Sequence, residues 1–132
     1  MIMDQLKDYS NYTVLIVDDI PVNIILLKTM LKKTGVRIIT AANGPDAMDL
    51  VRKERPHLVL LDIQMPLMNG LEVLENIKKS PELKETIVIM VSAYTSAQDI
   101  EQSMKLGAAG FIKKPVIMET FLECVTTELN KI

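Results

Sequence analysis

The sequence is poor in the residues that build disulfides and zinc sites. Among 132 residues it has one cysteine, Cys124, one histidine, His57, and no tryptophan. A single cysteine forms no internal disulfide, and the clustered cysteines and histidines of a zinc site are missing. Cys124 falls in a helical apolar pattern with Phe121 and Val125, so we expect a buried thiol without a catalytic role. We expect His57, which opens an apolar run behind Pro56, to be a surface residue.

Long apolar runs and an excess of one charge are missing as well. No stretch approaches the roughly 20 apolar residues that span a bilayer, and the first residues, MIMDQLKDYSNY, are too polar for a signal peptide. We therefore expect no membrane insertion and a cytoplasmic protein. The formal net charge of -2 predicts no basic surface, so we expect no direct binding to nucleic acid.

What the sequence does contain is an alternation of short β-branched runs with longer segments of helical spacing. Hydrophobic residues make up 48% and charged residues 24%, a balance typical of one globular domain at this length. We expect a lead-in over residues 1–12 and a single domain over 13–132. The β-branched runs predict strands over 13–18, 36–41, 57–62, 86–93 and 109–114.

Strands that are apolar on both faces and alternate with helices are typical of an α/β fold with a parallel sheet covered on both sides. Pro21 and Pro45 stand where helices are expected to begin, and Gly35 and Gly107 stand where helices are expected to end. In such doubly wound sheets, ligands bind at the carboxyl ends of the strands. The residues at those ends are therefore the candidates for function.

Carboxylates follow two of the predicted strands. Asp62 ends the third strand, and Asp18 and Asp19 end the first. If these strands are neighbours, three carboxylates share one rim and repel one another unless a cation compensates. Carboxylate oxygens without cysteine or clustered histidine favour Mg²⁺, or Mn²⁺, over zinc.

Two further polar side chains end the remaining strands. Ser92 ends the fourth strand and Lys114 the fifth, and a hydroxyl and an ammonium beside carboxylates suit a phosphoryl group. Asp62 is the candidate nucleophile, because aspartate forms acyl phosphates and it stands alone at its strand end. Taken singly, Asp18 and Asp19 could merely favour a helix N-terminus, and Lys114 could be a structural ion-pair partner. Five such residues at the ends of four strands favour one site.

Four motifs in order carry a resemblance to a known family. They are VLIVDD at 14–19 followed by Asn23, LVLLDIQMPLMNG at 58–70, VSA at 91–93 and FIKKP at 111–115. Together they resemble the receiver domain of two-component response regulators, in the superfamily of chemotaxis regulators, over residues 13–129. The resemblance implies a flavodoxin-like (βα)5 fold with strand order 2-1-3-4-5.

The resemblance also implies a phosphoacceptor and a metal site. Asp62 would accept a phosphoryl group from the phosphohistidine of a histidine kinase or a histidine phosphotransfer protein. Asp19 and Asp62 would hold Mg²⁺ together with the backbone carbonyl of Gln64, and Asp18 would act mainly through a water molecule. Such a domain is a signalling switch rather than an enzyme that turns over an external substrate.

Further roles follow from the same resemblance. Lys114 and Ser92 would bind the phosphoryl group, and Ser92 and Phe111 would switch the surface formed by the fourth and fifth helices and the last strand. Phe111 could equally be ordinary core, since an aromatic side chain on a strand packs whether or not it signals. Gln64 and Tyr94 would tune hydrolysis, in a direction that the sequence leaves open.

After Pro115 the sequence VIMET lacks the usual polar N-cap of the last helix. Val116, Ile117 and Met118 could therefore form an exposed apolar patch on the switching surface, through which the domain could dimerise. The sequence leaves open whether the domain is a stand-alone regulator, a relay intermediate or part of a hybrid kinase.

Two rival functions share parts of this pattern. An aspartyl phosphatase usually places a second aspartate two residues after the nucleophile, where this sequence has Gln64. A flavin-binding electron carrier needs a hydroxyl-rich phosphate loop after the first strand, and DDIPVN is acidic and apolar instead. The P-loop signature is also missing. The receiver domain fits the residues better than either rival.

Overall fold

The computed structural model describes residues 8–93 and 96–132. Its five strands lie within about two residues of the predicted ends. They are β1 Thr13–Val17, β2 Arg37–Ala41, β3 Leu58–Leu61, β4 Ile87–Ser92 and β5 Gly110–Lys113. The helices are α1 Pro21–Leu31, α2 Gly44–Glu54, α3 Gly70–Lys79, α4 Ala97–Lys105 and α5 Met118–Leu129, with a short 3-10 turn at Lys32–Thr34.

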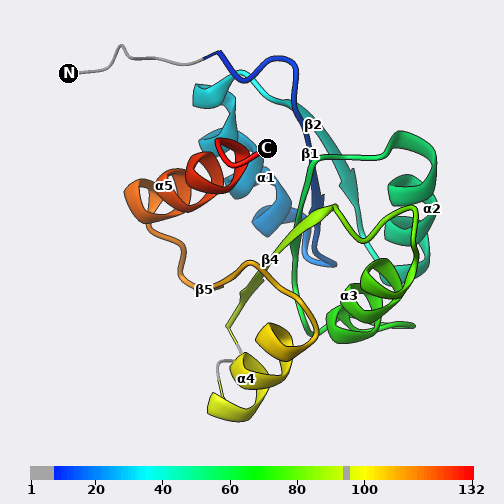
Figure 1. Cartoon of the computed structure of the whole chain (residues 1–132). Helices are drawn as coiled ribbons and strands as arrows, with labels where there is room; N and C mark the ends of the chain where they lie inside the picture. Colours follow the sequence, from blue (N-terminus) through cyan, green and yellow to red (C-terminus); the bar gives the residue numbers. More distant parts are fainter. Residues whose placement is uncertain (1–7, 94–95) are drawn as a thin grey trace.

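The strands form one sheet (Figure 1). They are all parallel and lie in the order β2-β1-β3-β4-β5, which confirms the predicted fold class and strand order. The registers of the central strands decide what meets at the carboxyl edge. Val17, the last residue of β1, lies opposite Leu61, the last residue of β3. The residues that follow them, Asp18 and Asp62, therefore leave the sheet side by side.

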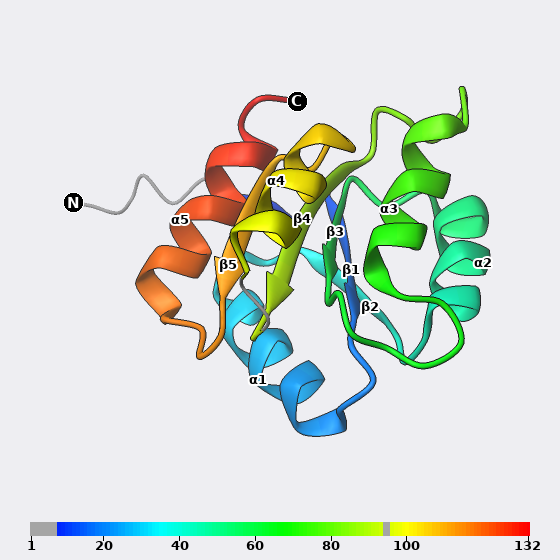
Figure 2. The same ribbon diagram turned by 90° about the horizontal axis from the view of Figure 1, so that it is seen from below.

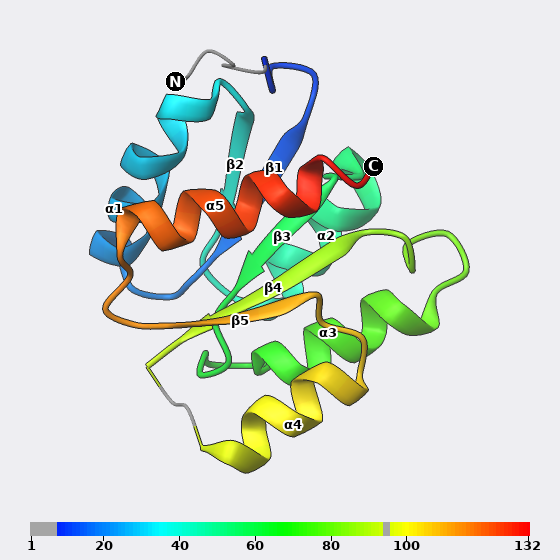
Figure 3. The same ribbon diagram turned by 60° about the vertical axis from the view of Figure 1, so that its left-hand side comes forward.

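Helices cover both faces of the sheet (Figure 2). Helices α1 and α5 lie side by side on one face, in contact with each other (Figure 3). They pack on β1 through Val14 and Ile16, whereas Leu15 and Val17 point into the cluster that α2 and α3 cover. This alternation along β1 is the two-residue period of a strand buried on both faces.

The structure confirms the helix boundaries that were predicted from proline and glycine. Pro21 opens α1, and Pro45 lies in the first turn of α2. Gly35 and Gly107 have φ angles of 84° and 108°, the left-handed conformation expected after a helix. None of the helices in the described ranges combines the length and apolar character needed to span a bilayer.

Residues 8–12, which precede β1, pack against the rest of the chain. Tyr9 is buried among the side chains of the α1 and α5 layer, and its hydroxyl donates to Asn130 Oδ1 at 2.9 Å. The ring of Tyr12 meets that of His57 at a centroid distance of 5.0 Å. The backbone N–H of Thr13 donates to His57 Nδ1 at 3.0 Å. His57 is therefore half-buried and joins the amino ends of β1 and β3, so the expectation of a surface residue was wrong.

Cys124 is half-buried rather than fully buried. Burial and then the charges of Glu128 and Glu123 raise the pKa of its thiol. A thiol with a raised pKa is a weak nucleophile, which agrees with the expectation that Cys124 has no catalytic role.

Candidate functional site

Three carboxylates meet at the carboxyl ends of β1 and β3. One oxygen from each of Asp18, Asp19 and Asp62 lies within 4.8 Å of the others. The sheet extends to this edge, because the Asp62 N–H donates to the carbonyl of Val17 and the Asp18 N–H to that of Ala41. Asp18 and Asp62 are buried, with 1% and 7% of their surface exposed, whereas Asp19 is exposed. The structure thus brings together the three acidic residues that the sequence singled out.

Lys114 reaches these carboxylates from the other side of β4. Its Nζ donates to Asp18 Oδ2 at 2.7 Å and to Asp62 Oδ2 at 3.2 Å. The backbone N–H of Lys114 donates to the carbonyl of Ser92, which fixes the end of β5 against the end of β4. The peptide bond between Lys114 and Pro115 is cis. The side chain of Lys114 therefore crosses the end of β4 to bridge β1 and β3.

Ser92 closes the site at the end of β4. It is buried, and its side chain contributes a hydrogen bond that lowers the pKa of Asp62. A cavity of about 330 Å³ opens over these groups. Its lining includes the predicted site residues Asp19, Asp62, Gln64, Ser92 and Lys114.

The electrostatic balance of the site is negative. Desolvation is the largest influence on Asp62 and, with the charge of Asp18, raises the pKa of its carboxyl against the opposing effect of Lys114. For Lys114, burial is the largest single influence and lowers the pKa, but the hydrogen bonds and charges of Asp18 and Asp62 together raise it. One ammonium thus faces three carboxylates, so a further cation would stabilise the cluster.

The raised pKa of Asp62 predicts a stability cost at neutral pH. A carboxyl that holds its proton more tightly in the folded chain than in the unfolded chain affects stability through pH. The folded protein loses stability as the pH rises from the ordinary carboxyl pKa through the raised folded value. We expect Asp62→Asn to raise the melting temperature at neutral pH, without metal, by about 2 to 5 °C. The gain should shrink as the pH falls to the ordinary carboxyl range. Thermal unfolding across pH checks this, and a gain that does not depend on pH would contradict it.

Two residues next to the carboxylates had no assigned role in the sequence. Asn23 is half-buried in α1, and its Nδ2 lies 3.4 Å from Asp18 Oδ1, which also accepts from the N–H of Ile20 at 2.9 Å. Gly70, the first residue of α3, donates its N–H to the carbonyl of Ile63 at 2.7 Å. A Cβ at Gly70 would lie 2.0 Å from the carbonyl oxygen of Asp62. The sequence signals were the asparagine of α1 and the Asn-Gly pair at the start of α3.

The donor set of the cluster fits Mg²⁺. Asp18, Asp19 and Asp62 offer only carboxylate oxygens, which are the ligands that this ion prefers, and Asp19 is open to solvent for an ion that keeps several waters. Gln64 lies along the same cavity, two residues after Asp62. The residues present therefore suit the ion that the resemblance implies.

Comparison with known proteins shows the family of this chain. The model of the response regulator receiver domain matches residues 14–126. The chain belongs to the response regulator receiver domains. Among curated proteins, it is 36% identical over 118 residues to the polar-differentiation response regulator DivK of Brucella anthropi. That match covers 89% of this chain and 96% of the relative.

Solved structures agree with the family. A CheY-like receiver domain protein from Methanospirillum hungatei has a TM-score of 0.85 at 31% identity, and the match covers 91% of this chain and 94% of that one. A structure of the CheX–CheY–BeF3–Mg²⁺ complex from Borrelia burgdorferi gives a TM-score of 0.84 at 33% identity, with 89% of each chain covered. The receiver domain thus belongs to two-component signalling, where such domains act as switches, and the rival identities as phosphatase or flavin carrier fall away.

The remaining predicted residues of the receiver domain lie around the site. Phe111 is half-buried on β5 and packs against the cluster that α2 and α3 cover. Gln64 is exposed at the cavity. Tyr94 lies outside the described residues. Ile117 and Met118 are exposed, as expected of the apolar patch, whereas Val116 is half-buried against the α1 and α5 layer.

Proposed function

We propose that Asp62 is the phosphoacceptor of this receiver domain and takes its phosphoryl group from a phosphohistidine on a histidine kinase or a histidine phosphotransfer protein. The observation that carries the proposal is the position of Lys114, whose Nζ lies 3.2 Å from Asp62 Oδ2. A nucleophilic carboxylate beside an ammonium and the hydroxyl of Ser92 has the groups that a transferred phosphoryl needs.

The residues would act in the following way. A carboxylate oxygen of Asp62 attacks phosphorus, and the bond between phosphorus and the donor's imidazole nitrogen breaks. The electron pair of that bond stays on the imidazole, which departs neutral when its other nitrogen carries a proton. Lys114 favours the charged form of Asp62 before transfer, and its ammonium donates to the phosphoryl oxygens afterwards. Ser92 donates a hydrogen bond from the end of β4.

The metal site belongs to the same proposal. Asp19 and Asp62 would hold Mg²⁺ with the backbone carbonyl of Gln64, and Asp18 would act mainly through a water molecule. The bound ion supplies positive charge that offsets the negative charge of the carboxylates and of the incoming phosphoryl group.

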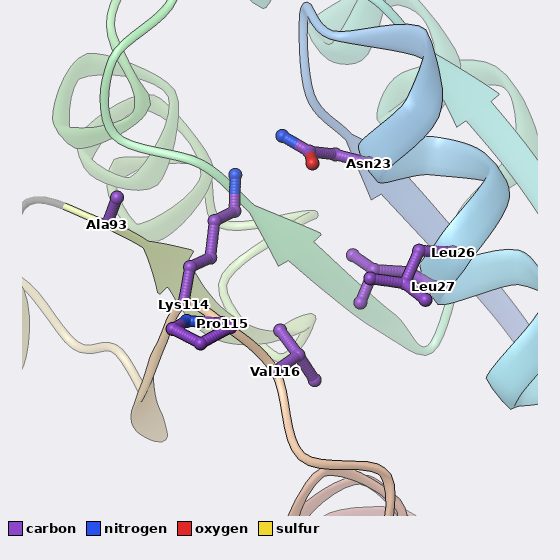
Figure 4. Close-up of a pocket in the computed structure, with 7 residues that line it drawn as sticks. All are labelled: Asn23, Leu26, Leu27, Ala93, Lys114, Pro115 and Val116. Atoms are coloured by element: carbon purple, nitrogen blue, oxygen red, sulfur yellow. The ribbon is translucent and has the colours of Figure 1, made fainter.

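A protein donor is supported by the apolar surface next to the site. Helix α1 leaves large side chains in solvent on its outer side, with Val22 66% and Ile25 61% exposed. Beside it, an apolar cavity of about 350 Å³ lies between Leu26 of α1 and the segment that holds Lys114 and Pro115 (Figure 4). Exposed apolar patches of this kind are typical of contact sites for other proteins.

Switching is proposed for the surface formed by α4, β5 and α5. Of the nine residues of α4, all of them described, only Ser103 is buried, so this helix has little packing energy to hold it in one place. Phosphorylation would draw Ser92 toward the phosphoryl group and turn Phe111 inward, which shifts the population of α4 positions. The exposed Ile117 and Met118 make this surface suitable for a homodimer.

Labelling with acetyl phosphate, a small donor, tests the proposal. The intact mass of the protein is measured over time with Mg²⁺ and, in parallel, with chelator. We expect a mass gain of one phosphoryl group with Mg²⁺ and a rate at least about a hundredfold lower with chelator, because the carboxylate cluster is then uncompensated. No gain from a folded protein that binds Mg²⁺ would contradict the phosphoacceptor role.

A further inference from the structure

The loop between β3 and α3 presents an apolar side chain to solvent in an unfavourable backbone conformation. Leu67 has a φ angle of 73° and is 84% exposed. The N–H of Met68 donates to the carbonyl of Pro66 at 2.8 Å, so Leu67 is the central residue of a three-residue turn with positive φ, a strained arrangement. Glycine or asparagine would fit this turn better. Folding therefore gives no reason for a leucine at this position.

The neighbouring residues hold the loop and leave Leu67 outside. Met65 and Met68 pack against the cluster under α2 and α3. Met68 also lies so close to Gly44 that a Cβ there would be 2.6 Å from the Cβ of Met68. The loop is closed by the hydrogen bond from Gly70 N–H to the Ile63 carbonyl. A loop that is already held in place loses little conformational entropy when a partner binds. An anchored loop with one side chain turned outward is therefore suited to be a contact site.

The loop also walls the phosphoacceptor cavity. Gln64 lines that cavity, and a groove of about 520 Å³ beside it runs along Met65, Pro66 and Asn69. Gly70 lies against the backbone of Asp62. Leu67 is three residues before Gly70, so the Cα of Leu67 lies within about 11 Å of the Gly70 Cα. A typical interface covers about 800 Å² on each partner, a patch about 16 Å in radius. A patch of that size centred on the cavity over Asp62 takes in Gln64 and so reaches into the loop that carries Leu67.

From this geometry we propose that Leu67 is a docking residue for the protein that donates the phosphoryl group, and that its side chain enters an apolar depression beside the donor's phosphohistidine. The inference rests on the proposed function. A donor histidine must reach Asp62, which is only 7% exposed, so the surface around that histidine has to press on the loops that bound the cavity. A small donor such as acetyl phosphate can enter without touching Leu67.

Two variants separate the side chain from the turn. Leu67→Gly and Leu67→Asn remove the apolar contact while keeping residues that tolerate positive φ. Ile132→Gln is the matched control, because Ile132 is also a large exposed apolar side chain but follows α5, outside the lining of the cavity. Both Leu67 variants should melt at or above the temperature of the unmodified protein, which shows that the fold is kept.

Transfer rates are then measured from two donors. The protein donor is whichever of a panel of purified histidine kinases, autophosphorylated with radiolabelled ATP, labels the unmodified protein fastest; the small donor is acetyl phosphate. We expect both Leu67 variants to lose about tenfold in rate from the kinase, as for the loss of one central apolar contact. Their rates from acetyl phosphate, and both rates of Ile132→Gln, should stay within about twofold.

Three results would overturn the inference. They are an unchanged rate from the kinase, an equal fall with both donors, and a protein that acetyl phosphate labels but no kinase of the panel does. A protein that acetyl phosphate fails to label would instead count against the phosphoacceptor role of Asp62. The two failures are therefore distinguishable.

Discussion

Asp62→Asn is expected to lose labelling by acetyl phosphate by a factor of at least about a thousand. An amide in this position has no anionic oxygen with which to attack phosphorus. Lys114 would keep its 2.7 Å contact to Asp18, so the shape of the site is retained and the loss is chemical. The higher melting temperature expected of the same variant shows independently that a lower rate does not come from unfolding.

Asp99→Asn is the control for this loss. Asp99 lines the groove beside the phosphoacceptor cavity but does not line the cavity itself. Asp99 is half-buried, and its replacement removes a nearby negative charge. The labelling rate should stay within about threefold, since water and salt screen the charge across the open groove. Labelling of Asp62→Asn at the rate of the unmodified protein would mean that another residue accepts the phosphoryl group.

Gly70→Ala is expected to lower the free energy of unfolding by about 3 kcal/mol. The added methyl group would lie 2.0 Å from the carbonyl oxygen of Asp62 and 2.9 Å from the Cα of Ile63. Both contacts are with backbone, which cannot rotate away as a side chain does. Either α3 or the end of β3 has to move, so the variant should also label more slowly than the unmodified protein.

Gly110→Ala is the matched glycine variant. A Cβ at Gly110 would lie 3.6 Å from the sulfur of Cys124, an ordinary van der Waals contact. Alanine is less costly than glycine inside a strand, so we expect no loss and a gain of up to about 1 kcal/mol. Urea unfolding of both variants measures the difference, and equal effects of the two substitutions would show that the close approach at Gly70 does not limit the fold.

The sequence predicts the carboxylate site well because strand ends and strand order are enough to place it. Asp18 and Asp62 follow the last residues of two strands, and parallel neighbours in register must bring such residues together. The pattern does not say which contact Lys114 makes. Its shorter hydrogen bond goes to Asp18, three strands away, and only the length of the lysine side chain across the end of β4 allows this.

Helix α1 shows that hydrophobic periodicity does not fully predict which of its apolar side chains are buried. The sequence pattern places Ile24, Leu27 and Leu31 on one face, and in the structure Leu27 and Leu31 are buried and Ile24 is half-buried. Ile25 and Leu26 are just as apolar but remain in solvent. An apolar side chain shows the same pattern whether it faces the core or a partner, so only the packed helix separates the two.

The sequence did not predict the half-buried position of His57 or the positive φ angle of Leu67. The half-buried position of His57 depends on Tyr12 and Thr13, which lie more than forty residues earlier in the chain. The positive φ of Leu67 is imposed by the closure of its loop onto Gly70 and Met68, and leucine itself gives no signal of it. Contacts between distant segments set the position of His57, and the closure of its own loop sets the conformation of Leu67.

Locating the phosphoryl group within the labelled chain tests the central claim most directly. After labelling with acetyl phosphate and Mg²⁺, borohydride reduces an aspartyl phosphate to homoserine with loss of phosphate, and tandem mass spectrometry reads the converted residue. The account predicts homoserine at position 62, with Asp18 and Asp19 unchanged. Homoserine at position 18 or 19, or a phosphate ester on Ser92, would contradict the assignment of Asp62 as the phosphoacceptor.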